Sequence, residues 1–158
     1  IHFGDYYRLT NAMEEGPYAS LTGLGGNKDF APHQLGHALS EKFDVFHGDS
    51  LTAVWSSWAR YVLDTNVSRF ARFARNVWGV TLTDDREAAL EGIAKQESFF
   101  RSIGMPVCLG ELSCGKQDEA GLADLASRCS YGKTRTIGTF RVLDYEKILA
   151  IYRRANEA

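Results

Sequence analysis

Apolar residues recur at helical spacing in four segments of this chain, and that spacing limits the possible folds more than any other feature. In segment 51–62 they stand at offsets of 0, 3, 4, 7, 10 and 11 from Leu51, and segment 67–78 repeats these offsets from Val67. Segments 90–103 and 145–152 follow the same period. Such positions collect on one face of an α-helix, because each turn takes about 3.6 residues. The sequence therefore predicts four amphipathic helices that share a core.

Capping residues mark where several of these helices begin and end. Asp84, with Glu87 three residues later, forms a capping-box pattern, and Asp144 stands where an N-cap side chain is expected before the last helix. Gly104 suits the position that follows a helix C-terminus, and Pro106 prevents the helix from continuing. The sequence thus fixes the expected start of two helices and the expected end of one.

The remaining segments are less regular. A helix interrupted at Gly16-Pro17 is predicted for 5–22 and another for 118–129, whereas 103–118 is expected to be loop and 131–142 extended or irregular. No sustained alternation of Val, Ile and Thr indicates a series of strands. The length of 158 residues is typical of one domain. The predicted fold class is therefore a single all-α domain, a helical bundle joined by short polar turns.

Charge and cysteine usage exclude several classes of protein. The chain carries 18 Lys and Arg against 20 Asp and Glu, a net charge of −2, so it has no basic field for a nucleic acid backbone. No apolar run reaches the ~18 residues of a membrane span. An odd set of cysteines, Cys108, Cys114 and Cys129, favours free thiols in a reducing compartment, which predicts a cytoplasmic protein. A first residue other than Met, without a signal-peptide pattern, predicts a piece of a longer chain.

Three of the four histidines, His33, His37 and His47, fall within fifteen residues. Neutral imidazole is the commonest metal ligand, so this clustering indicates a metal site. If Asp29 caps a helix here, His33 and His37 project from one face, and helical spacing by itself would pair them. That pair lacks the adjacent Glu of a metalloprotease, and two ligands leave a metal under-coordinated. The alternative is that these are packed or surface histidines near three aspartates that act as caps or solvated charges, namely Asp29, Asp44 and Asp49.

The segment that carries the histidines has a specific pattern beyond their spacing. It reads Gly25-Gly26-x-x-Asp29-Phe30-Ala31-x-His33-x-x-Gly36-His37-Ala38-Leu39-Ser40, followed by Phe43-Asp44-Val45-x-His47-Gly48. This pattern resembles that of the iron-containing alcohol dehydrogenases, and it is most similar to the NAD(P)H-dependent butanol dehydrogenases among them. The similarity covers nearly the whole chain from about residue 5, and continues through Phe70–Gly79, Phe99–Pro106, Ile137–Leu143 and Ile148–Arg154.

The resemblance implies a fold, a metal and roles for individual residues. The fold would be the C-terminal helical bundle of the dehydroquinate synthase-like, iron-containing alcohol dehydrogenase fold, with residues 1–158 as its metal-binding C-terminal domain. A divalent metal, Fe2+ or Zn2+, would be held by an Asp and three His, of which His33 and His47 are the last two. His37 would be a catalytic, cofactor-contacting residue beside the nicotinamide and the substrate, where it helps to move protons. The Asp, the other His and the NAD(P)-binding N-terminal domain lie upstream in the family and are absent from this sequence.

The function implied by the resemblance is oxidoreduction between primary alcohols and aldehydes with NAD(P)H. The complete enzyme is expected to be a homodimer that binds a small alcohol or aldehyde, with neither nucleic acid nor membrane as a partner. The piece alone is expected to be inactive, because half of its metal ligands and its cofactor domain are missing. Two alternatives stay open: a non-catalytic helical binding or scaffold domain derived from the same family, and a metal-dependent hydrolase that uses His33, His37 and a carboxylate.

Overall fold

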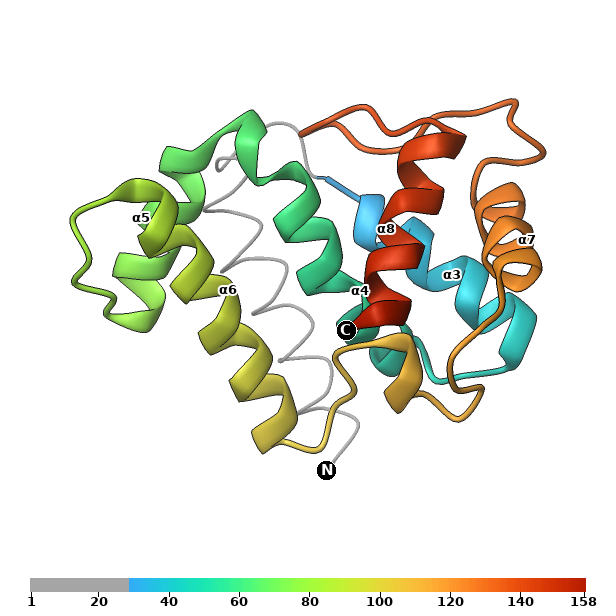
Figure 1. The fold of residues 1–158 in the computed structure, drawn as a ribbon, viewed down its shortest axis with the longest axis horizontal. Helices are drawn as coiled ribbons and strands as arrows, with labels where there is room; N and C mark the ends of the chain where they lie inside the picture. The colour runs from blue at the N-terminus through green and yellow to red at the C-terminus, as the bar shows by residue number, and fades with distance from the viewer. Residues whose placement is uncertain (1–28) are drawn as a thin grey trace.

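A computed structural model describes residues 29–158, and α-helices carry almost all of its regular structure (Figure 1). Among the described residues, the only β contact is an isolated antiparallel bridge between Ile137 and Leu143. The all-α prediction is confirmed, whereas the helix predicted for 5–22 lies outside the described residues. The elements in chain order are α3 (Ala31–Phe43), α4 (His47–Val62), the 3-10 segment η2 (Leu63–Thr65), α5 (Val67–Trp78), α6 (Asp85–Ser102), the 3-10 segment η3 (Leu109–Glu111), α7 (Glu119–Cys129) and α8 (Tyr145–Glu157).

The helices predicted over 51–62, 67–78, 90–103, 118–129 and 145–152 correspond to α4, α5, α6, α7 and α8. One difference bears on function, because α4 begins at His47 rather than at Leu51. Its first turn, His47-Gly48-Asp49-Ser50, contains no large apolar residue, so periodicity cannot detect it. The Ser50 amide nevertheless donates to the Phe46 carbonyl at 3.0 Å, which starts the helix before its apolar face begins.

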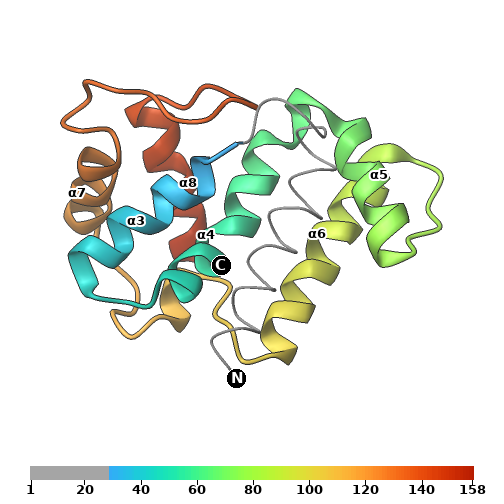
Figure 2. The same cartoon turned by 180° about the vertical axis from the view of Figure 1, so that it is seen from behind.

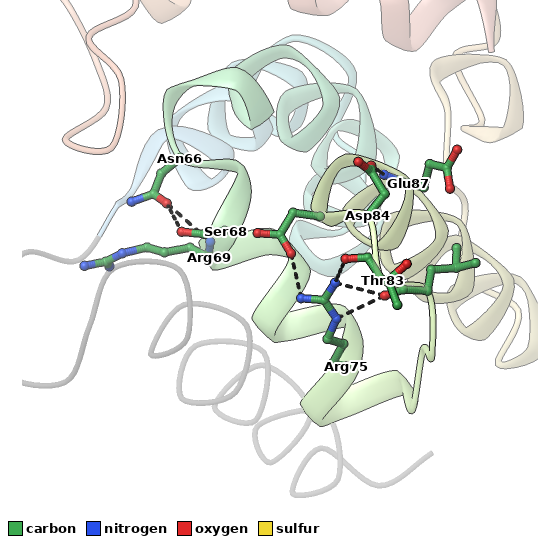
Figure 3. Close-up of polar contacts among 9 residues, drawn as sticks. Asn66, Ser68, Arg69, Arg75, Thr83, Asp84 and Glu87 are labelled. Carbon is green, nitrogen blue, oxygen red and sulfur yellow. Dashed lines mark hydrogen bonds and ion pairs between the residues drawn. The ribbon is translucent and has the colours of Figure 1, made fainter.

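Side-chain caps begin the helices where the sequence predicts them. The Asp84 carboxylate accepts the amide N–H of Glu87 at 2.9 Å, and Asp144 accepts that of Lys147 at 3.1 Å. Asn66 caps α5 in the same way (Figure 3). Each of these bonds satisfies an amide that has no acceptor within its helix. The caps therefore set where these helices start.

The C-terminus of α6 also ends as predicted. Gly104 adopts the left-handed conformation, with a φ of 77°, and donates its amide N–H to the Arg101 carbonyl at 3.0 Å. The next amide, of Met105, reaches the Phe100 carbonyl at 2.9 Å. This pair of bonds closes the helix and turns the chain away from its axis. The segment that follows is loop apart from η3.

The helices are arranged around α4, which is the most buried of them. In two opposite views, α5 and α6 stand on one side, α3 and α7 stand on the other, and α4 and α8 lie between (Figures 1 and 2). Trp55 and Trp58 of α4 are buried in the main core, and Tyr152 of α8 donates its hydroxyl to the Leu35 carbonyl of α3 at 2.8 Å. Gly92 lets α6 approach α5, because a Cβ there would stand 2.4 Å from the Cβ of Ala74. The packing thus leaves α3 and the start of α4 at the edge of the bundle.

Two further features bear on the predictions of cellular context. Cys108 and Cys129 are buried, and Cys114 is partly exposed; all three are free thiols. Within residues 29–158, no helix combines the length and the apolar character that a membrane crossing requires.

Candidate metal and catalytic site

The three clustered histidines come from two helices that meet at a tight corner. His33 and His37 lie one turn apart on α3, and His47 is the first residue of α4. Between them the chain reverses at Asp44, which has a left-handed φ of 54° and donates its amide N–H to the Ser40 carbonyl at 2.9 Å. This reversal places the first residue of α4 beside the middle of α3. We call these residues, 33–47, the histidine corner.

A glycine in α3 allows the two helices of the corner to approach. A Cβ at Gly36 would stand 2.9 Å from the Ser50 hydroxyl oxygen and 3.1 Å from Cδ2 of Leu51. Ser40 donates its hydroxyl to that of Ser50 at 3.1 Å, which links the helices again one turn further along. The position of His47 relative to α3 is therefore set by small side chains packed against each other.

The imidazole rings are close to one another across this corner. The ring centroids of His33 and His47 are 5.5 Å apart, and those of His37 and His47 are 5.1 Å apart. The helical pair, His33 and His37, is the widest at 6.3 Å. His47 is thus nearer to each histidine of α3 than these two are to each other, contrary to the pairing that helical spacing alone would suggest.

The separations of His47 from His33 and from His37 both fit a shared metal ion. Two imidazoles that bind one metal at about 2.1 Å with tetrahedral angles have ring centres roughly 5 Å apart. Among residues 29–158, no group of three or more His, Cys, Asp or Glu side chains is arranged to hold a metal ion. A protein site normally has three or four ligands. The described histidines could therefore supply some of the ligands of a metal site, but the described residues do not form a complete site.

The aspartates near the corner have separate roles. Asp29 is buried; it accepts the amide N–H of Ala31 at 2.8 Å and that of Phe140 at 3.0 Å. Burial raises its pKa, and these amide bonds oppose that shift. Asp29 therefore satisfies the first amide of α3, as predicted, although the N-cap position itself belongs to Phe30. Asp44 is exposed in the reversal, and burial raises the pKa of Asp49 in the first turn of α4.

The corner opens to the surface. His37 and His47 are exposed and His33 is half-buried. Two aromatic side chains flank them in the sequence, Phe30 at 48 % and Phe46 at 82 % exposure. Large apolar side chains at such exposure beside polar ones are typical of binding surfaces. The imidazoles are accordingly accessible to a ligand from outside the bundle.

A groove of about 340 Å³ runs along α3 next to the corner. Its α3 side includes His33, Gln34 and His37. Its other side includes Arg128 of α7 and the following residues Tyr131 and Arg135. We call this the His37 groove. The residues beyond α7 carry no signal in the sequence pattern, because they lie in a segment without periodicity and far along the chain from His37.

A family model for the C-terminal part of the Fe-containing alcohol dehydrogenase family matches residues 4–156. The chain belongs to this family. The described helices match the C-terminal helical domain of the family's solved members, so the predicted fold and the predicted membership are both confirmed.

Relatives in the alcohol dehydrogenase family support this membership. The chain is 35% identical over 145 residues to the probable NADH-dependent butanol dehydrogenase 2 of Bacillus subtilis, covering 86% of this chain and 36% of that protein. It is 32% identical over 155 residues to the NADH-dependent butanol dehydrogenase A of Clostridium acetobutylicum, covering 96% and 39%. The chain thus spans between 36% and 39% of the length of these two relatives.

Solved structures show the same similarity in three dimensions. The aldehyde reductase YqhD of Escherichia coli superposes with a TM-score of 0.75 at 25% identity, over 85% of this chain and 35% of that one. The NADH-dependent butanol dehydrogenase A of Thermotoga maritima gives a TM-score of 0.73 at 26% identity, over 82% and 33%. Each of these structures contains a part, about a third of its length, that has the fold of this chain.

Proposed function

We propose that this chain is the metal-binding C-terminal domain, residues 1–158, of an enzyme that interconverts primary alcohols and aldehydes with NAD(P)H. His33 and His47 are the metal ligands, and His37 is the catalytic residue that contacts the cofactor. The observation that carries the proposal is the approach of His47 to α3, where its ring centroid lies 5.5 Å from that of His33. The His37 ring is equally near, at 5.1 Å, and the family resemblance is what selects His33 as the second ligand. Histidines fourteen residues apart in the chain would not meet without the reversal at Asp44.

The chemistry follows from what each imidazole can reach. When bound, Fe2+ or Zn2+ supplies Lewis acidity to the alcohol or aldehyde oxygen, and the nicotinamide supplies or accepts the hydride. His33 and His47 would hold the metal through ring nitrogens. His37 is exposed and lines the groove, where its imidazole could give a proton to the substrate oxygen or take one from it. The corner thereby separates metal binding from proton transfer.

The proposal assigns the rest of the site to another part of the enzyme. An Asp and a third His complete the ligand set, and a nucleotide-binding domain holds NAD(P)H, as the family resemblance implies. The exposure of His37, His47 and Phe46 supports this assignment, because those side chains can face a second domain. The complete enzyme is proposed to be a homodimer.

Metal binding by the full chain tests the ligand assignment. We expect Zn2+ or Co2+ to bind weakly, with a dissociation constant in the micromolar range or above, because two of the usual four ligands are supplied here. His33→Ala and His47→Ala should each abolish this binding, measured by calorimetry and by the visible absorption of Co2+. His37→Ala is the matched control and should leave binding intact. Loss of binding in His37→Ala, or its persistence in His47→Ala, would contradict the assignment.

An activity assay tests the division between domains. Reduction of butanal by NADH or NADPH should be undetectable with this chain alone, even with added ferrous iron, since the cofactor has no binding domain in it. Clear turnover by the chain would refute this division. Turnover that appears on adding the nucleotide-binding part of a relative would support it.

A further inference from the structure

The far side of the His37 groove is built from a strained turn that metal binding does not require. α7 lies beside α3 in both views of the bundle (Figures 1 and 2). Tyr131 and Arg135, in the segment that follows α7, line the groove. There Tyr131, Gly132 and Lys133 have successive left-handed φ angles of 48°, 62° and 69°. Such angles are strained for side chains with a Cβ, above all for a bulky one like Tyr. Strain of this kind tends to gather at ligand-binding sites.

Hydrogen bonds around Ser130 hold the turn in this conformation. The Ser130 hydroxyl is buried; it donates to the Ala126 carbonyl at 2.7 Å and accepts the Lys133 amide at 3.2 Å. The Gly132 amide donates to the Ser127 carbonyl at 2.8 Å. The turn is thus fixed by several bonds at once, and its strain places the Tyr131 ring at the rim of the groove with 63 % exposure.

The Arg135 guanidinium lies over this ring and supplies positive charge. Its Cζ is 3.7 Å from the centroid of the Tyr131 ring, and its Nε and Nη2 donate to the Cys129 carbonyl at 3.2 and 3.1 Å. In residues 29–158, no carboxylate lies within ion-pair distance of Arg135. Arg128, by contrast, is paired with Asp124 and with Glu41, the one carboxylate among the described residues that line the groove. Among the described residues, no acidic side chain therefore neutralises the positive charge that Arg135 brings to the groove.

Capping of α7 explains only part of this arrangement. The bonds from Nε and Nη2 satisfy a carbonyl at the C-terminus of α7, which is an ordinary role for Arg. That role needs neither an exposed ring nor a left-handed Tyr, and it leaves Nη1 without a hydrogen bond among the described residues. A planar guanidinium with free N–H groups suits a carboxylate, which can accept two parallel bonds.

We propose that the His37 groove selects aldehyde or alcohol substrates whose far end carries a carboxylate, with Arg135 and Tyr131 as the specificity-determining residues. The inference rests on the proposed function and names the substrate class of that site. The reacting carbon lies at the end of the groove lined by His37, and the carboxylate lies at the end lined by Arg135. The Tyr131 ring covers the alkyl chain between them. The volume of about 340 Å³ is within the range of small-molecule sites.

Nuclear magnetic resonance titration of the full chain tests the proposal without metal or cofactor. Succinic semialdehyde should shift the side-chain signals of Arg135, Tyr131 and His37, whereas butanal, which lacks the carboxylate, should bind roughly tenfold more weakly, as the loss of a charged hydrogen bond implies. Arg135→Gln should reduce the binding of succinic semialdehyde to that of butanal. Equal binding of the two aldehydes, or no binding of either, would overturn the proposal.

Adenosine diphosphate distinguishes a substrate carboxylate from a cofactor phosphate. It should leave the Arg135 signals unchanged. If it shifts them more strongly than succinic semialdehyde does, the groove recognises the cofactor and the substrate assignment is wrong. Because carboxylate binding needs no hydride transfer, the absence of dehydrogenase activity would leave this result standing. Reduction of butanal by the complete enzyme without any preference for succinic semialdehyde would overturn the groove assignment alone.

A pair of glycine variants separates strain from recognition. Tyr131→Gly and Lys133→Gly each relieve a left-handed residue, so each should raise the melting temperature by a few degrees. Only Tyr131→Gly should weaken binding of succinic semialdehyde, because Lys133 does not line the groove. Equal effects of the two variants on binding would show that the turn acts through stability, against the proposal.

Discussion

The α3–α4 pair and the α5–α6 pair both pack around a glycine, but they expose very different surfaces. Gly36 lets α4 approach α3, and Gly92 lets α6 approach α5. In the second pair Phe70, Phe73 and Phe100 are buried, and Arg75 donates hydrogen bonds to the carbonyls of Leu82 and Thr83 (Figure 3). In the first pair the imidazoles of His37 and His47 face outward. The same packing device thus supports a stable core in one pair and leaves reactive side chains accessible in the other.

The largest expected loss of stability comes from removing a buried aromatic ring from the α5–α6 pair. Phe73 is fully buried, and its ring centroid lies 6.3 Å from that of Trp55. Phe73→Ala should lower the free energy of unfolding by about 4 kcal/mol, since both the transfer of the ring and the cavity contribute. Urea denaturation measures this change. A loss below about 1 kcal/mol would show that the α5–α6 pair is not part of the folding core.

A matched pair of glycine substitutions compares the two helix contacts directly. Gly92→Ala should lower the free energy of unfolding by about 2 kcal/mol, because its Cβ would stand 2.8 Å from the backbone Cα of Ala74, which cannot rotate away. Gly36→Ala should change it by less than about 1 kcal/mol. The two atoms nearest to the new Cβ, Ser50 Oγ and Leu51 Cδ2, belong to side chains, and Ala favours helix.

For Co2+ binding the order of the two variants should be reversed, with the larger effect expected from Gly36→Ala. Gly36→Ala displaces the Ser50 hydroxyl, which donates to the His47 carbonyl at 2.7 Å, and so shifts His47, which should weaken Co2+ binding roughly tenfold. Gly92→Ala should leave Co2+ binding unchanged, because its contact is with α5. If both variants weaken Co2+ binding equally, the histidine corner is not independent of the α5–α6 pair.

An ion pair between α4 and α6 gives a smaller effect that depends on pH. Arg60 donates two hydrogen bonds of 2.7 Å to Glu97, whose side chain is 17 % exposed. Burial raises the pKa of the Glu97 carboxyl, but the bonds and charge of Arg60 outweigh burial and hold the pKa below its usual value. Glu97→Gln should therefore cost about 1 kcal/mol at pH 7.

The sign of the pH dependence follows from that lowered pKa. The stabilisation by Glu97 is present above its unfolded-state pKa of 4.5 and is lost as the pH falls through the lower folded-state pKa. The free energies of unfolding of the native chain and of Glu97→Gln should thus converge in acid. Urea denaturation at pH 7 and pH 3 checks this, and a difference that grows in acid would contradict it.

The sequence predicts α4, α5 and α6, because their apolar periods are local signals and Asp84 marks the start of α6. It gives α3 only as a helix that Asp29 would cap. It does not predict that α4 starts at His47, since Gly48, Asp49 and Ser50 extend no apolar face. The family resemblance, rather than helical spacing, selects His47 as a partner of His33. Helical spacing relates only residues of the same helix, whereas the 5.5 Å separation between His33 and His47 depends on the chain reversal at Asp44.

The far side of the His37 groove could not be predicted at all. Tyr131 and Arg135 approach α3 only because α7 packs beside it, a contact between segments about a hundred residues apart. Their turn also depends on the buried hydroxyl of Ser130, and one Ser in a polar segment carries no distinctive pattern. Tertiary contacts of this kind are not encoded in any local period.

The smallest expected effect comes from Phe46, the residue before His47. Its side chain is 82 % exposed, so Phe46→Ala should change the free energy of unfolding by less than about 0.5 kcal/mol, against about 4 kcal/mol for the buried Phe73. Phe46 is also the N-cap of α4 and provides no side-chain hydrogen bond there. Phe46→Ser should therefore stabilise the chain by up to about 1 kcal/mol, because a Ser hydroxyl can accept a first-turn amide. Urea denaturation of both variants tests this. A clear loss of stability in Phe46→Ala would mean that Phe46 supports the fold. A gain in Phe46→Ser would mean that the chain keeps an exposed ring at a cap position where a polar residue would be more stabilising.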